Sequence, residues 1–147
     1  MATVYSAQRT NSRATPAVMN KANELGGRVR VAHGTYEASA LASGDVIEMF
    51  ILPDGARLLE GSLAHDALGA STTLSVGYGA HTNAAGTAVS ASAAASTSAQ
   101  KVDILATLAL GSGSEVDANN DGMPVTVTMG GAAGTGTIEV TIQYVVD

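Results

Sequence analysis

The chain has 147 residues, a length that fits one domain, and no cysteine, which excludes disulfides, thiolate catalysis and cysteine-based zinc sites. Only 3% of the residues are aromatic, so the core must be aliphatic, and abundant glycine, serine, threonine and valine favour strands joined by tight turns over helices. No stretch has the length of a signal peptide or a membrane span, and we expect a protein made in the cytoplasm without membrane contact.

Charge is divided unevenly along the chain. Five of the seven Lys and Arg residues precede residue 31, where Glu24 is the only acid, although the whole chain has a net charge of −6. The five basic residues are Arg9, Arg13, Lys21, Arg28 and Arg30. They are spaced singly, with almost no aromatic residues between them for base stacking. This pattern favours an acidic protein surface over nucleic acid as their partner.

The first 27 residues show no sustained hydrophobic period, and Pro16 interrupts any helix there. We therefore predict an extended basic N-terminal arm over residues 1–27. One short helical turn is expected around Met19–Leu25, ended by Gly26 and Gly27. The alternative interpretation is a disordered tail.

From residue 28 the pattern becomes that of short strands. Strands are predicted around Val29 and Val31, through Tyr36 to Leu41 after a break at His33-Gly34, and at 46–52, 57–63 and 72–78. The apolar run 46–52 predicts a strand covered on both faces, and Pro53-Asp54-Gly55 after it predicts a tight turn. In the run 57–63, Leu59 and Leu63 are expected on one face.

The second half of the chain is less uniform. Residues 84–98 are mostly Ala, Ser and Thr and predict a loop, whereas residues 102–110 fit a strand or a helix, with strand favoured. Strict alternation then predicts two half-buried antiparallel strands, at 125–129 and 138–144. Seven or eight short strands without useful helices predict an all-β fold, a jelly-roll-like antiparallel β-sandwich over residues 28–147.

One motif has the spacing of a calcium loop. Asp117, Asn119 and Asp121 offer oxygens at alternate positions before Gly122, but the twelfth position holds Thr128 in place of a bidentate glutamate. An Asx-rich turn explains the same residues. We expect no metal and no cofactor.

Catalytic patterns are not found in the sequence. The histidines His33, His65 and His81 are expected at the surface or in turns, since His65 and the adjacent Asp66 would point to opposite faces of a strand and not act as an acid-base pair. Neither a nucleophile elbow nor a phosphate-binding loop is present. The sequence therefore predicts a protein that binds other proteins and is not an enzyme.

A family resemblance covers roughly residues 28–147. The segments 44–56 and 66–77, with the strands 125–128 and 136–142, resemble small virion proteins of tailed bacteriophages, in particular capsid decoration, or cement, proteins. The resemblance implies a jelly-roll domain, commonly a trimer, on the outer capsid surface where neighbouring major capsid proteins meet. The arm residues Arg9, Arg13, Lys21, Arg28 and Arg30 would then lie along acidic patches of the shell.

Two other functions fit the same fold. A trimeric attachment or spike module would bind a host receptor through its loops, although few aromatic residues are available for a sugar site. A tail or connector subunit would be distinguished by ring formation.

Overall fold

The structure of the chain is a computed structural model that describes residues 4–22, 24–78, 87–92, 99–104 and 122–146. These residues form eight strands in two four-stranded antiparallel sheets and one short helix. The elements are α1 (Ala7–Arg13), β1 (Val29–Leu41), β2 (Val46–Leu52), β3 (Arg57–His65), β4 (Thr72–Tyr78), β5 (Thr87–Ser92), β6 (Gln100–Asp103), β7 (Met123–Gly131) and β8 (Gly134–Val145). The predicted all-β fold is confirmed.

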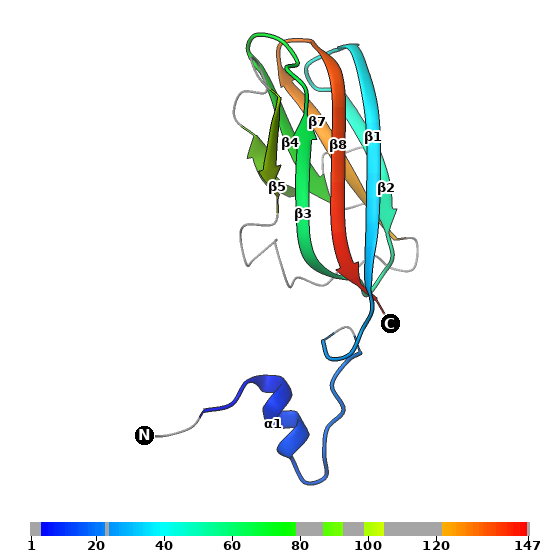
Figure 1. Ribbon diagram of the computed structural model, residues 1–147, viewed down its shortest axis with the longest axis vertical. Helices are drawn as coiled ribbons and strands as arrows, with labels where there is room; N and C mark the ends of the chain where they lie inside the picture. Colours follow the sequence, from blue (N-terminus) through cyan, green and yellow to red (C-terminus); the bar gives the residue numbers. More distant parts are fainter. Residues whose placement is uncertain (1–3, 23, 79–86, 93–98, 105–121, 147) are drawn as a thin grey trace.

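The strand order identifies the architecture. One sheet has the order β1-β8-β3-β6 and the other β2-β7-β4-β5. Strands β1 to β4 therefore alternate between the two sheets, β5 stays beside β4, and β6 to β8 alternate again, so that β8 and β7 lie between earlier strands. Eight strands in two sheets with this order form a jelly roll of two Greek keys. Figure 1 shows the sheets stacked face to face, with the N-terminal segment leaving from the end where the C-terminus lies.

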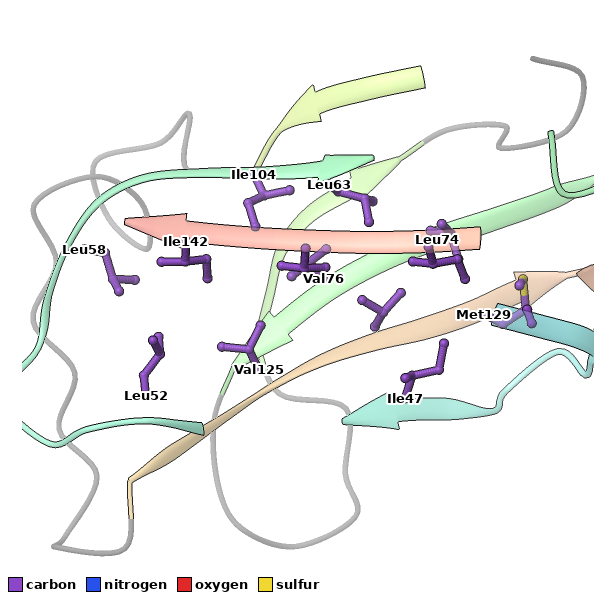
Figure 2. Packing of buried hydrophobic residues seen from close by; sticks show 14 of the residues in the cluster. Ile47, Leu52, Leu58, Leu63, Leu74, Val76, Ile104, Val125, Met129 and Ile142 are labelled. Carbon is purple, nitrogen blue, oxygen red and sulfur yellow. The ribbon is translucent and has the colours of Figure 1, made fainter. Parts of the chain in front are cut away.

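An aliphatic core fills the space between the sheets, as Figure 2 shows. It is built from alternate residues of the strands, which is why the period of two predicted the inner faces of β7 and β8 correctly. The largest fully buried side chains are Leu52, Leu58, Leu63, Leu74, Ile104, Met129, Ile138, Ile142, Val76, Val125, Val127 and Val140.

Strand β1 continues through the predicted break at His33-Gly34. A Cβ atom on Gly34 would lie 3.0 Å from the Met49 carbonyl oxygen and 3.1 Å from Phe50 Cδ1. The glycine therefore permits a close approach between β1 and β2 and does not form a turn.

Strand β2 was predicted to be covered on both faces, and this is wrong. Val46 and Ile51 are exposed, because β2 is an edge strand of an antiparallel sheet that has only one face on the core. The turn predicted after it is confirmed, since Ala56 N donates to the Pro53 carbonyl oxygen at 3.2 Å.

A bulge changes the inward face of β3. The register with β8 shifts between Leu58 and Glu60, so Leu58 and Leu63 are both buried, while Leu59, predicted on the core face, is only half-buried. A bulge inserts one residue and so moves the residues before it to the opposite face.

The loop predicted at 84–98 is wrong where β5 lies. Thr87–Ser92 pairs with β4 through its backbone, for example Val76 opposite Ser90. The backbone hydrogen bonds to the edge of β4 therefore outweigh the weak strand propensity of this Ala- and Ser-rich segment. In the ambiguous segment 102–110, the backbone is a strand up to Asp103, and residues 105–110 lie outside the described residues.

Candidate interaction surface

The N-terminal arm is folded in part, where an extended chain was predicted. Ser6 caps α1, and its hydroxyl accepts a hydrogen bond from Arg9 N at 3.2 Å. The helix ends at Arg13, ahead of Pro16, because proline and the residue before it do not continue a helix.

Asn20 holds the returning chain against α1. Its Nδ2 donates to the Gln8 carbonyl oxygen at 3.1 Å and to Ser12 Oγ at 3.2 Å, while its Oδ1 accepts from Asn11 Nδ2 at 3.2 Å. No residue of α1 is buried. The unit is therefore held by partly buried and exposed hydrogen bonds and not by buried apolar side chains of the helix.

Replacing Asn20 with alanine is expected to loosen α1 without affecting the sandwich. The change removes three hydrogen bonds of about 0.5–1.5 kcal/mol each, which would make opening of the helix at least about tenfold more frequent. Amide hydrogen exchange of residues 7–20 measures this. Thr15→Ala is the control, and a fall in the melting temperature of the sandwich with Asn20→Ala would contradict the separation of the two parts.

A turn and an ion pair lie where the arm joins the sandwich. Glu24 N and Leu25 N both donate to the Lys21 carbonyl oxygen, at 3.0 and 3.1 Å, which places a turn within the predicted segment. Glu24 Oε1 then lies 3.3 Å from Nη2 of Arg57, the first residue of β3. This contact fixes where the arm leaves the sandwich.

The five predicted basic residues are all exposed. Arg9 and Arg13 lie on α1, Lys21 lies in the turn, and Arg28 and Arg30 lie just before and within the start of β1. Among the described residues, no carboxylate is within salt-bridge distance of the four arginines. Their charge is therefore available to a partner.

Exposed apolar side chains gather in the same region. The large ones among the described residues are Val4, Tyr5, Val18, Met19, Leu25, Val29, Val31, Tyr36, Val46 and Ile51. Eight of these ten lie on the arm, at the start of β1 or at the end of β2, and only Tyr36 and Val46 do not. The sequence analysis did not predict this gathering, because alternation assigns a residue to a face and not to an end of the sandwich.

Strand register shows that these strand ends meet. Val29 is opposite Val145, which is also opposite Arg57, and the tight turn after Leu52 joins the end of β2 to Arg57. We call this end of the sandwich, where β1 and β3 start and β2 and β8 end, the base. The arm leaves from this end, so the exposed apolar and basic side chains of the arm and of the base lie on the same side of the molecule.

A cavity of about 440 Å³ lies toward the opposite end of the sandwich. Its lining residues come from the end of β3, from β6 and from the start of β8, and they are Ala64, His65, Asp66, Ala99, Gln100, Lys101, Thr137 and Glu139. Ala64 of β3 is paired with Lys101 of β6 on one side and with Glu139 of β8 on the other, so a small residue lies between two charged ones. The cavity is therefore polar and of mixed charge.

His65 was predicted at the surface or in a turn, and it is buried. Its Nδ1 donates to the Asp66 carbonyl oxygen at 2.7 Å, and its buried Nε2 has no hydrogen-bond partner among the described residues. Nε2 does not contact solvent in this conformation.

The remaining candidates are four residues outside the described part of the chain and one exposed histidine. Asp117, Asn119, Asp121 and His81 lie outside the described residues, and His33 is exposed as predicted. Within the described part of the chain, no three His, Asp or Glu side chains are grouped as metal ligands. In that same part, no helix has the length and apolar character needed to cross a membrane.

The comparisons with known proteins point to phage capsids. No protein-family model and no curated protein matches the chain. Among solved structures, the chain is similar to a chain in the capsid of Ralstonia phage GP4, with 25% identity, a TM-score of 0.61, and 82% of this chain and 86% of that chain covered. It is also similar to a chain in the capsid asymmetric unit of cyanophage Pam1, with 20% identity, a TM-score of 0.59 and both chains covered in full. The chain therefore shares its jelly-roll fold with chains of two phage capsids, and this likeness supports a structural role in a bacteriophage virion.

Proposed function

We propose that this chain is a non-enzymatic decoration protein of a phage head. It binds the outer capsid surface at junctions between major capsid proteins and stabilises the expanded head. The observation that carries this proposal is the gathering of exposed apolar and basic side chains on the arm and base, at one end of the jelly roll. The likeness to a chain of the Ralstonia phage GP4 capsid supports it.

The two parts of the chain have different roles in this proposal. Residues 28–147 form the sandwich, whose base rests on the shell and buries apolar side chains such as Val31 and Ile51. Residues 1–27 form the arm, and Arg9, Arg13 and Lys21, with Arg28 and Arg30 beside the base, lie along acidic patches of the capsid.

Oligomerisation strengthens the attachment. A homotrimer presents three bases and three arms to neighbouring shell subunits, so a modest contact per copy gives a stable complex through effective concentration. The partners are then the major capsid protein and two further copies, with no nucleic acid or membrane.

Co-sedimentation with expanded heads that lack the protein tests the proposal. The full chain is expected to bind saturably at a fixed ratio to the major capsid protein, and a chain lacking residues 2–27 to bind more weakly. Thermal unfolding of both forms is the control for folding, because α1 contributes no residue to the core. If neither form binds, the proposal is wrong, and binding to host cells or ring formation would identify an attachment module or a connector subunit instead.

A further inference from the structure

We propose that one face of α1, presented by Arg9 and Arg13 with Tyr5 beside it, docks onto a pair of neighbouring carboxylates on an acidic protein surface, and that this contact keeps the helix folded. The inference rests on the proposed function, because it assigns that surface to the capsid shell. It separates α1 from the other basic residues of the arm and gives it a defined partner chemistry.

The geometry of α1 assigns its two sides to different tasks. The side chains of Asn11 and Ser12 and the carbonyl oxygen of Gln8 are hydrogen-bonded to Asn20. Arg9 and Arg13 are four residues apart, so their side chains lie one above the other on a different face, with Cβ atoms about 5–6 Å apart. One side of the helix is therefore bound to its own chain and the other presents two guanidinium groups.

Tyr5 prepares one of these groups for binding. The Arg13 guanidinium carbon lies 4.8 Å from the centroid of the Tyr5 ring, a cation–π contact. Stacking restricts the rotamers of a long side chain, while the edge of the guanidinium plane can still donate two parallel hydrogen bonds to one carboxylate. Two arginines in this arrangement match two carboxylates spaced as on a neighbouring helix or strand.

Such a partner would add to the stability of the helix. It has seven residues, none of them buried, and isolated helices shorter than about 12–15 residues are marginal in water. Like charges four residues apart weaken it further. Carboxylates on a partner would reverse the second effect, so helix formation and binding are coupled.

The surroundings of this face favour a protein over nucleic acid. Val4 and Val18 are exposed on the same arm, and Met19 is 94% exposed. Such side chains gain nothing from a phosphate backbone but can be buried against a protein surface.

The test compares three variants of the full chain for binding to heads that lack the protein. Arg9→Lys with Arg13→Lys keeps the charge but loses the paired hydrogen bonds, and we expect the dissociation constant to rise about tenfold. Arg9→Gln with Arg13→Gln removes both the charge and the paired hydrogen bonds, and we expect the dissociation constant to rise about a hundredfold. Lys101→Gln, an exposed basic residue of the far cavity, is the control and is expected to leave binding unchanged.

Each outcome separates this inference from the proposed function. Absence of binding by the unsubstituted chain would overturn the proposed function. Undiminished binding by both double variants would overturn only the inference about α1 and leave the proposed function standing. If only the glutamine double variant binds heads more weakly, positive charge alone accounts for the contact, and the proposed pairing of each arginine with a carboxylate is wrong. If the glutamine variant loses binding to duplex DNA but keeps binding to heads, the partner is nucleic acid. Slower amide exchange of residues 7–13 on heads is expected, and unchanged exchange would overturn coupled folding.

Discussion

Replacing Val31 and Ile51 together with aspartate is expected to abolish saturable binding to phage heads while leaving the sandwich folded. The two side chains are 60% and 52% exposed and lie at the base, one from each sheet. Full burial of an apolar side chain of this size contributes about 1.5–3 kcal/mol, and about half of that remains to be gained on binding, so losing both side chains weakens binding by about ten- to a hundredfold. Desolvation of two carboxylates against the shell adds to the loss.

A matched control comes from the same edge strand. Val46 is also exposed, but it is the first residue of β2 and so lies at the end opposite the base. Val46→Asp is expected to leave the dissociation constant unchanged in the same co-sedimentation assay. An equal loss with Val46→Asp would mean that the base is not the attachment surface.

Replacing Ile142 with alanine is expected to destabilise the fold strongly. Ile142 is 1% exposed and lies in β8, between β1 and β3 in the centre of its sheet. Truncating a fully buried isoleucine costs about 2–5 kcal/mol, because apolar contacts are lost and a cavity remains. For a chain of this size the melting temperature would fall by about 10 °C, measured by calorimetry or circular dichroism.

Gln143→Ala is the control for Ile142, since the next residue of β8 points to the outer face. Its expected cost is within about 0.5 kcal/mol. Equal costs at the two positions would contradict the assignment of the inner and outer faces of β8.

Most strands of the fold could be predicted from the chain alone. The alternation at 125–129 and 138–144 indicated which side chains of β7 and β8 face the core, and Pro53-Asp54-Gly55 indicated the turn after β2. Such signals are local, since they depend on side chains two to four residues apart. They do not state which strands become neighbours.

The errors share a physical cause. Gly34 was interpreted as a break, but its role is set by Met49 and Phe50 on another strand. The burial of His65 depends on packing at the end of β3, and the strand at Thr87–Ser92 depends on the free edge of β4. In each case the deciding contact is distant in sequence.

The arm shows the same division. Its basic residues were evident from the sequence, but α1 was missed, although Ser6 in the position of an N-cap was an available signal. The hydrogen bonds from Asn20 to residues 8 and 12 then complete a unit that no local pattern predicts.

The sequence by itself determined the all-β class, the aliphatic core and the division into a basic arm and an acidic body, because composition and a period of two are properties of the chain. Only the tertiary structure decided that Val29, Val31 and Ile51 share one end of the molecule with the arm. The physical reason is that alternation fixes the face of each strand, while strand order and register, which bring distant residues to one end, depend on contacts that form only when the whole jelly roll is folded.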